Sequence, residues 1–415
     1  MQWLKEIPSH WEEKRAKYIY QKQNRIPKEN DDVITCFRDG EVTLRKNRRT
    51  TGFTESFKEI GYQGIKKGDL VIHQMDAFAG ATGVSDSDGK GTPVYSVCTP
   101  IDNQSLTKYH AMVIRLMGLN GFIQSLYRGI RERSSDFRFE TFARQFLPLP
   151  PLAEQEKIVS YLEGKTSKID AYVADKEKEI ELLQELKQKT IADAVTKGLN
   201  PDAKMKDSDI SWIGEIPEHW EVKQLRSFLT LFTEKGHGDA QLLSVTREQG
   251  VIERDKYDKD ENHNFVPDDL SGYKYIEKGD FAINKMKAWQ GSYAVSNYDG
   301  IVSPAYFTCK LKGVNNDFFS KAIRSRAYVP FFTQYSKGIR VGQWDLNPNA
   351  LKSIPFFLPP SDEQQAIVAY IEEKCEKIDK LASELQSEID YLKEYKQRLI
   401  ADCVTGQVNV QNEMI

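Results

Sequence analysis

Short apolar runs bounded by Gly, Pro and Asp dominate two stretches of the chain. They are GDLVIHQM from Gly68, PVYSVCTP from Pro93, GDFAINKM from Gly279 and AYFTCKL from Ala305. β-Branched and aromatic residues between turn-forming residues predict strands. The run FFSKAIRSRAYVPFF from Phe318 instead predicts a helix. These stretches are therefore expected to fold as mixed α/β globular parts.

A second pattern follows each globular stretch, where charged residues surround apolar residues at heptad spacing. The pattern is regular in residues 359–407, and weaker in residues 151–199, where Lys176 and Thr190 interrupt it. Apolar residues repeated every seven positions predict long helices that pair with another helix, and each helix is the obvious partner of the other. Ser361 and Gln364 predict a capping box at the start of the second helix. The predicted seam consists of Leu162, Ile169, Leu183, Ile371, Ile378, Leu381, Leu385, Leu392 and Leu399, and Tyr395 fills the same seam position as Leu381.

Both patterns belong to one unit that occurs twice. The phrase EIPSHWE at 6–12 returns as EIPEHWE at 215–221, an offset of 209, and GYQGIKKGDLVIHQM returns as GYKYIEKGDFAINKM at an offset of 211. A repeat of about 200 residues predicts two copies of one architecture. The expected division is a first domain at 1–150, a helix at 151–199, a linker at 200–210, a second domain at 211–358, a helix at 359–407 and a tail at 408–415.

The charge of the chain is uneven. Its 415 residues carry a formal net charge of −3, but residues 1–150 hold 23 Lys and Arg against 18 Asp and Glu, whereas residues 361–415 hold 6 against 12. A basic first domain permits a polyanionic partner without requiring one. The five cysteines form no CxxC pair, which favours buried thiols in a reducing cytoplasm over disulfides. No apolar run reaches the roughly 20 residues of a membrane span.

Catalytic signatures are scarce. The sequence contains neither a GxxxxGK[ST] phosphate loop nor a GxGxxG strand–helix turn, and its LPPL, LPPS and NPNA segments lack the amino-methyltransferase pattern. His10 and His219 are expected to be structural partners of the tryptophans that follow them. A nuclease-like pattern can be assembled from Asp202, Glu221 and Lys223, but its Pro-Asp lies in a polar linker and is absent from the first copy. The chain is not expected to be an enzyme by itself.

Three motifs that occur in the same order in both halves carry a resemblance to a known family. They are WIGEIPEHWEV at 212–222, KGDFAINKMKAWQG at 278–291, and the Leu-Pro-Pro…Glu-Gln entrances to both long helices. On these motifs the sequence resembles, over nearly its whole length, the specificity (S) subunits of type I restriction–modification systems.

The resemblance implies a non-catalytic, cytoplasmic subunit with two target-recognition domains. Each domain would read one half of a split, asymmetric DNA target, and the two antiparallel helices would hold the domains apart. Methyltransferase (M) subunits and ATP-driven restriction (R) subunits would assemble on this scaffold, and S-adenosylmethionine, ATP and Mg would bind to those partners and not to this chain. A duplicated coiled-coil adaptor without sequence-specific DNA binding is the alternative.

Residues identical between the copies in the Gly-Asp segments are expected to be framework, and divergent polar residues beside them are expected to contact base edges. Clusters of cations that recur at the same repeat position are expected to contact phosphates or bases. The framework set is Gly68, Asp69, Met75 and Gly80 with Gly279, Asp280, Met286 and Gly291. Gln and Asn suit adenine edges, whereas Lys and Arg suit guanine or phosphate. The candidate DNA contacts are Arg45, Lys46, Arg48, Arg49, His73, Gln74, Arg128, Arg131, Arg133, Arg138, Asn284, Lys285, Lys287, Trp289, Lys337, Arg340, Gln343 and Trp344, with Asp76 as a further divergent position.

Overall fold

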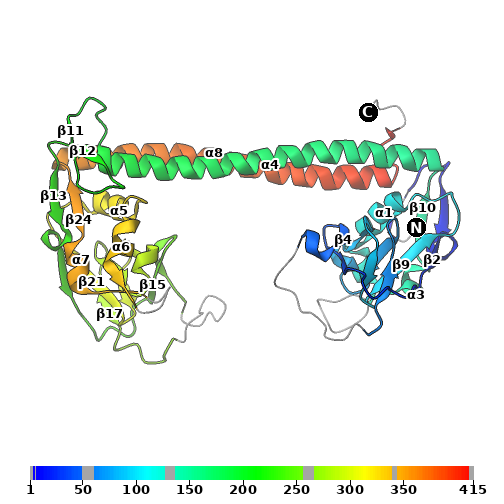
Figure 1. Cartoon of the computed structure of the whole chain (residues 1–415), viewed down its shortest axis with the longest axis horizontal. Coiled ribbons are helices and arrows are strands. Elements are labelled where there is room, and N and C mark those ends of the chain that lie inside the picture. The colour runs from blue at the N-terminus through cyan, green and yellow to red at the C-terminus, as the bar shows by residue number, and fades with distance from the viewer. Residues whose placement is uncertain are drawn as a thin grey trace. The chain divides into compact units, whose positions relative to one another are not determined.

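The computed structural model describes residues 3–4, 6–48, 60–126, 136–255, 266–338 and 344–410 (Figure 1). The chain divides into two compact units, one formed by Met1–Lys176 with Ser387–Ile415 and the other by Glu177–Gln386. Each unit contains one globular part and a length of both long helices. Helical residues of both repeats therefore contribute to each unit.

A four-stranded antiparallel sheet forms the centre of each globular part. Its order is β2-β9-β6-β7 in the first unit and β14-β21-β18-β19 in the second. Leu70 pairs with Cys98 on one side and Val84 on the other, and its counterpart Phe281 pairs with Cys309 and Val295. The register is thus the same in both copies. The strands are β2 (Tyr20–Lys22), β6 (Leu70–His73), β7 (Thr82–Val84) and β9 (Tyr95–Pro100), and β14 (Leu229–Phe232), β18 (Phe281–Asn284), β19 (Tyr293–Val295) and β21 (Tyr306–Leu311).

Two-stranded ladders and short helices complete each globular part. In the first unit they are β1 (Glu12–Arg15) with β10 (Phe146–Leu149), β3 (Ile34–Cys36) with β4 (Val42–Leu44), β5 (Gln63–Ile65) with β8 (Gly89–Gly91), and the helices α1 (Thr107–Leu119), α2 (Phe122–Ser125) and α3 (Phe139–Phe142). In the second unit they are β11 (Met205–Asp207) with β12 (Glu215–Pro217), β13 (Glu221–Gln224) with β24 (Pro355–Leu358), β15 (Leu243–Thr246) with β16 (Gly250–Glu253), β17 (Lys274–Ile276) with β20 (Gly300–Val302), β22 (Ser336–Lys337) with β23 (Asp345–Leu346), and the helices α5 (Asn316–Arg324), α6 (Val329–Tyr335) and α7 (Pro348–Ser353).

Strand β6 is buried on both faces, which explains its continuous apolar run. Leu70 and Ile72 join the cluster that contains Tyr109 of α1, whereas Val71 joins a second cluster with Ile34 of β3. Strand β18 is divided between two clusters in the same way. Neighbouring residues of a strand point to opposite faces, so covering both faces requires apolar residues at successive positions.

The thiols of Cys98 and Cys309 lie in this double layer. Both residues are fully buried and unbridged, and burial raises the pKa of each thiol to about 12. The expectation of buried, unpaired thiols at these two positions is confirmed.

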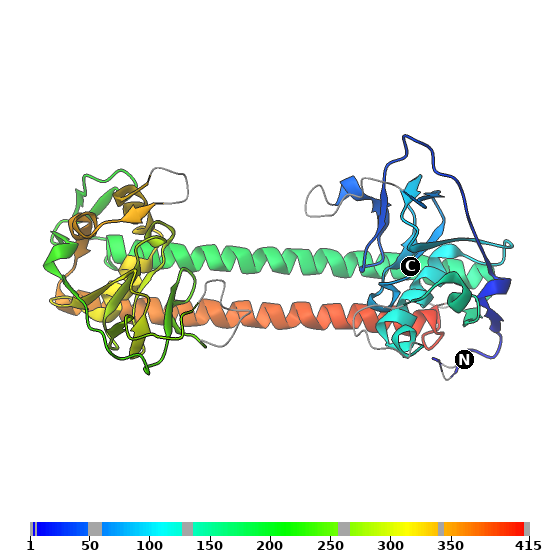
Figure 2. The same cartoon turned by 90° about the horizontal axis from the view of Figure 1, so that it is seen from below.

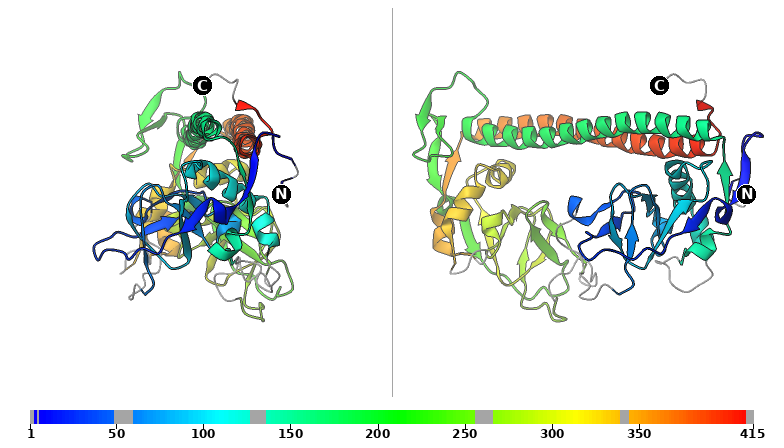
Figure 3. Two further views of the ribbon diagram at one scale, coloured as in Figure 1. Left: turned by 90° about the vertical axis from the view of Figure 1, so that its right-hand side faces the viewer. Right: turned by 45° about the vertical axis from the view of Figure 1, so that its right-hand side comes forward.

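The long helices are α4 (Leu152–Lys197) and α8 (Ser361–Val404). In the first unit Lys396 Nζ lies 2.6 Å from Asp170 Oδ1, and in the second unit Lys187 Nζ lies 2.7 Å from Asp379 Oδ1. These are one contact formed twice, because each lysine and each aspartate has its counterpart 209 residues away. Within each unit the two helices run side by side and antiparallel (Figures 2 and 3).

The seam between α4 and α8 differs from the predicted one at its second position. Leu385 and Leu399 are buried, but Leu381 is 41 % exposed and Tyr395 is 55 % exposed. The side chains that follow Ile378 and Leu392 on the inner face come four residues later, at Ala382 and Lys396, not three residues later. Placing Leu381 and Tyr395 on the seam was therefore wrong, because the second seam position of each heptad comes four residues after the first, not three.

The repeated phrase near the start of each copy attaches to the first turn of a long helix. His10 Nε2 lies 2.9 Å from Glu154 Oε2, and His219 Nε2 lies 2.8 Å from Glu363 Oε2. The indole Nε1 of the buried Trp220 also donates to Glu363, at 3.1 Å. Both histidines therefore have the structural role expected of them.

A buried glutamine attaches the first turn of each long helix to its globular part. Gln155 accepts a hydrogen bond from the Leu106 N–H at 2.8 Å, and Gln364 accepts one from the Asn315 N–H at 2.9 Å. The Gln364 amide also donates to the Pro359 carbonyl, at 2.9 Å. The capping box predicted for Ser361 does not form, because the Gln364 side chain is used by these contacts.

Candidate nucleic-acid interface

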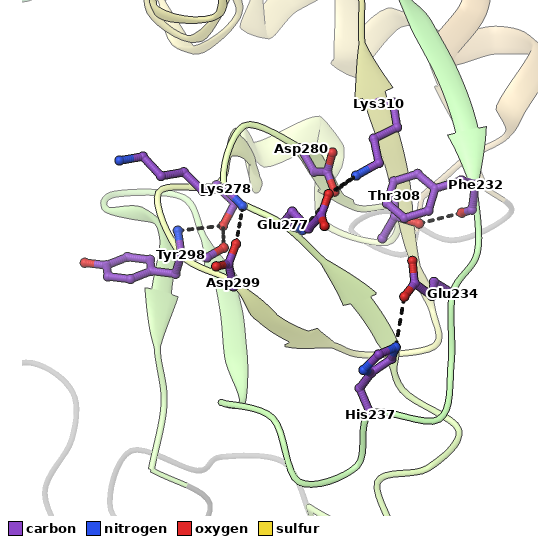
Figure 4. A network of polar contacts seen from close by, with 11 residues as sticks. Phe232, Glu234, His237, Glu277, Lys278, Asp280, Tyr298, Asp299, Thr308 and Lys310 are labelled. Atoms are coloured by element: carbon purple, nitrogen blue, oxygen red, sulfur yellow. Dashed lines mark hydrogen bonds and ion pairs between the residues drawn. The ribbon is translucent and has the colours of Figure 1, made fainter.

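The turn that enters β18 is fixed by a network of backbone N–H groups and carboxylates (Figure 4). Asp280 is 3 % exposed, accepts from the Glu277 N–H at 2.9 Å, and forms an ion pair with Lys310 at 2.9 Å. The Lys278 N–H donates to Asp299 Oδ1 at 2.7 Å. Gly279 has a φ of +95°, which favours glycine. The start of the strand is thus held rigidly.

The same turn recurs before β6. The buried Asp69 accepts from the Lys66 N–H at 2.7 Å and forms an ion pair with Arg25, and the Lys67 N–H donates to Asp88 at 2.8 Å. Gly68 has a φ of +91°. The identical Gly-Asp pairs are therefore framework in both copies, as predicted.

The loop that follows β6 carries the first pair of candidate base contacts. His73 accepts hydrogen bonds at Nδ1 from the N–H groups of Met75 and Asp76, at 3.3 and 3.2 Å, and packs edge-on to Tyr95. Partial burial lowers the pKa of His73, which favours the neutral imidazole. The half-buried Gln74 lies beside it, with its amide Nε2 3.5 Å from Ser96 Oγ.

The two methionines of this loop are not framework residues. Met75 is 47 % exposed and Met286 is 59 % exposed. Their identity in both copies therefore does not reflect core packing, and the expectation for these two positions was wrong.

The corresponding loop of the second unit brings several candidates together. Lys285 Nζ lies 3.2 Å from Asp345 Oδ2, and the rings of Trp289 and Trp344 lie 5.1 Å apart. The Asn284 amide lies 3.4 Å from the Tyr306 hydroxyl. Strand β22 adds the exposed Lys337, whose backbone pairs with Asp345, and Lys287 is exposed on the loop itself. The candidates of the second unit thus gather around the end of β18.

The basic candidates after β4 are paired with nearby acidic groups. Lys46 lies 2.6 Å from Asp32, and Arg48 lies 2.6 Å from Asp39 and 2.8 Å from Glu41. Arg45 Nε lies 3.3 Å from the Thr35 hydroxyl. Elsewhere in this unit Arg138 Nε lies 2.6 Å from Asp136. These cations therefore have local counter-charges or polar partners, and do not form a bare positive patch.

Six candidates lie outside the described residues: Arg49, Arg128, Arg131, Arg133, Arg340 and Gln343.

Two half-buried arginines outside the set of sequence-based candidates occupy equivalent sites. Arg115 of α1 donates through Nη1 to the carbonyl oxygens of Arg38 and Gly80, at 2.5 and 2.6 Å. Arg324 of α5 donates to the carbonyls of Tyr293, Arg247 and Glu248, at 2.9–3.0 Å. Burial lowers the pKa of both guanidinium groups. Their identity at an offset of 209 was the signal that could have found them.

Among the described residues, no group of three or more His, Cys, Asp or Glu side chains could hold a metal ion. The nuclease-like Lys223 forms an ion pair with Glu221 at 2.5 Å along β13. No helix in the described ranges combines the length and apolar character needed to cross a membrane.

Comparison with known sequences identifies similar proteins. No family model matches the chain. It is 26 % identical over 286 residues to the type I restriction enzyme MjaVIII specificity subunit of Methanocaldococcus jannaschii, covering 64 % of this chain and 63 % of that protein. It is 22 % identical to the MjaX specificity subunit of the same organism, covering 98 % of this chain and 95 % of that protein. The third similar protein is the EcoKI specificity subunit of Escherichia coli K12, with 23 % identity over 64 % of this chain and 58 % of that protein.

The alignments with the MjaVIII and EcoKI subunits thus span less than two thirds of those proteins.

Solved structures share the fold. A chain from a study of the complex assembly and conformational transition of a type I R-M system has a TM-score of 0.68 at 14 % identity, with 97 % of this chain and 100 % of that chain covered. The HsdS subunit from Thermoanaerobacter tengcongensis has a TM-score of 0.54 at 14 % identity, with 97 % and 99 % covered. The similar sequences and the shared fold confirm the resemblance of this chain to the specificity subunits of type I restriction–modification systems.

Proposed function

We propose that this chain recognises a bipartite, asymmetric DNA sequence, with residues 1–150 reading one half and residues 211–358 the other. The observation that carries the proposal is a repeated framework with divergent loops. The turn and the register of β6 and β18 are the same, whereas His73 and Gln74 at the end of one strand correspond to Asn284 and Lys285 at the end of the other. Base edges are distinguished by such donor and acceptor side chains.

The assembly extends beyond this chain. M subunits dock on it, and R subunits join the full complex; S-adenosylmethionine, ATP and Mg bind to those partners. The chain itself performs no catalytic step. The comparisons support this proposal because the similar proteins are named as specificity subunits. The long helices α4 and α8 act as a spacer between the two reading domains, and the complex works on DNA in the cytoplasm.

A domain exchange tests the reading function. Residues 61–90 and 272–301 span equivalent segments at the 211-residue offset. Cells carrying the chain with its methyltransferase are expected to methylate one bipartite motif, which sequencing of methylated bases identifies. Replacing 61–90 by 272–301 should change one half-site and leave the other half unchanged. A methylation motif that is the same before and after the exchange contradicts the assignment of these loops.

An adaptor without sequence-specific binding gives a different result. The complex of this chain with its methyltransferase would then shift a target duplex and a scrambled duplex equally in an electrophoretic assay. Discrimination between the two duplexes supports DNA recognition, and equal binding contradicts it.

A further inference from the structure

One hairpin in each unit ends in an exposed arginine at the same repeat position. Arg38 lies in the turn between β3 and β4, and Arg247 lies in the turn between β15 and β16. Their side chains are 65 % and 69 % exposed. The offset between them is 209 residues, although the residues around them differ.

Each hairpin turn is held by a half-buried arginine of a later helix, α1 or α5. Arg115 joins the Arg38 carbonyl to the Gly80 carbonyl, which ends the loop after β6. Arg324 joins the carbonyls of Arg247 and Glu248 to that of Tyr293, just after the loop that follows β18. The guanidinium fork presents several N–H donors in a fixed geometry, so one side chain fixes the turn and the loop together.

The exposed arginines therefore lie next to the candidate base-reading loops. Arg38 Nη2 lies 2.9 Å from Asp76 Oδ1, and Asp76 follows His73 and Gln74 in the first loop. A Cβ built on Gly291 would lie 3.9 Å from the Cγ of Arg247, and Gly291 ends the second loop. Each arginine also has one acidic neighbour, since Arg247 Nε lies 3.4 Å from Glu248 Oε1.

The identity of the two arginines indicates what they bind. The two halves of an asymmetric target differ in their bases but share the phosphate backbone. Contacts to phosphates orient a protein on DNA and carry no sequence information. A residue that is the same in both domains, exposed, and fixed beside divergent loops fits a phosphate contact better than a base contact.

We propose that Arg38 and Arg247 are matched phosphate contacts of the two domains, and that Arg115 and Arg324 are the residues that position them. This inference rests on the proposed DNA-reading function. On binding, a phosphate oxygen takes the place of Asp76 beside Arg38 and of Glu248 beside Arg247.

The test measures how binding depends on salt. The chain assembled with its methyltransferase is titrated with the target duplex, defined beforehand by methylation sequencing, at several salt concentrations. Each phosphate contact contributes about 0.9 to the log–log salt slope on duplex DNA. Arg38→Ala and Arg247→Ala should each flatten the slope by about 0.9, and the double variant by about 1.8, with the methylated motif unchanged.

Two further variants sharpen this test. Glu248→Gln removes the carboxylate beside Arg247 and should tighten binding, because less competition remains for the guanidinium. Arg226→Ala removes an exposed arginine of a different element, the short helix Leu225–Ser227, and should leave the slope unchanged. Slopes unaltered in Arg38→Ala and Arg247→Ala, or flattened equally by Arg226→Ala, overturn the proposal.

A double-mutant cycle tests the positioning role. If Arg324 acts through the hairpin turn, Arg324→Met and Arg247→Ala should lower the affinity by less together than the product of their separate effects. A merely structural role predicts independent losses that multiply. Arg324→Lys replaces Arg324→Met if the latter does not fold, as judged by thermal unfolding.

The binding experiments distinguish an error in the proposed DNA recognition from an error in the proposed phosphate contacts. If the wild-type complex does not distinguish its target from a scrambled duplex, the proposed function is wrong. If it does distinguish them and only the salt slopes stay unchanged, the phosphate contacts alone are wrong.

Discussion

Lengthening both long helices together tests whether they act as a spacer between the reading domains. The helices pair through Asp170 with Lys396 and through Lys187 with Asp379. An insertion in α4 alone would shift one of these pairs relative to the other. The insertion therefore follows Lys176 in α4 and Leu385 in α8, which are equivalent positions 209 residues apart.

The expected effect follows from helix geometry. Four inserted residues add about 6 Å and about 40° of rotation at 1.5 Å and 3.6 residues per turn. DNA rises about 3.4 Å per base pair and turns by about 35° per base pair at 10–10.5 base pairs per turn. One extra base pair leaves a mismatch of about 2.6 Å and 5°, and two leave about 0.8 Å and 30°. Either mismatch is small enough for a longer target to be bound.

Seven inserted residues should give the opposite outcome. They preserve the heptad seam and add about 10.5 Å, with a net rotation of about −20°. Three base pairs match the length, but they turn by about 105°, so the domains would be misoriented by about 125°. Such an insertion should abolish specific methylation although the helices pair well.

Methylation sequencing in cells distinguishes these outcomes. The four-residue variant should methylate the two original half-sites, separated by one or two additional base pairs. The seven-residue variant should methylate none. If the seven-residue insertion is tolerated with an unchanged gap, helix pairing alone matters, and the spacer role is refuted.

Three other predictions concern cofactors, thiols and the basic segment after α2. Calorimetry should detect no S-adenosylmethionine binding to the chain without its partner subunits; binding would contradict the assignment of this cofactor to the M subunit. At pH 8 the thiolate fraction of Cys98 and Cys309, with pKa values of about 12, is roughly a thousandfold below that of a thiol of pKa 9. A thiol reagent should therefore modify the partly exposed Cys375 first, and equal rates for all three would contradict the burial. Arg128→Ala with Arg131→Ala should weaken DNA binding and flatten its salt slope, whereas an unchanged slope would assign these side chains to solvent or to a protein partner.

Much of the fold follows from the sequence because its patterns are physical. Continuous apolar runs such as Leu70–Ile72 belong to a strand covered on both faces, and the heptads belong to paired helices. A heptad spacing does not by itself show which of two neighbouring residues faces the partner helix, however. Leu381 and Ala382 both continue a pattern from Ile378, and only the antiparallel packing places Ala382 on the seam.

The candidate site was less predictable. Divergent polar residues such as Asn284 and Lys285 could be selected as candidate readers by comparing the copies. Arg38 and Arg247 are also identical and exposed, but they were not selected, because the recurring cations chosen as contacts were those of the segments at 128–138 and 337–344. The comparison misassigned Met75, because its identity in both copies was taken as a sign of framework. Identity between copies shows that a residue is constrained, but not whether packing or a ligand constrains it.

The buried glutamines that attach each long helix to its globular part have a consequence for how recognition domains can be exchanged. Gln155 and Gln364 hold their globular parts through main-chain groups only, namely the N–H groups of Leu106 and Asn315 and, for Gln155, the Gln104 carbonyl. A main-chain partner is available whatever side chain the residue carries. A globular part can therefore change in sequence without loss of these glutamine contacts, as long as its backbone keeps the same course. Attachment through main-chain groups would let globular parts of different sequence specificity be combined with the same long helices.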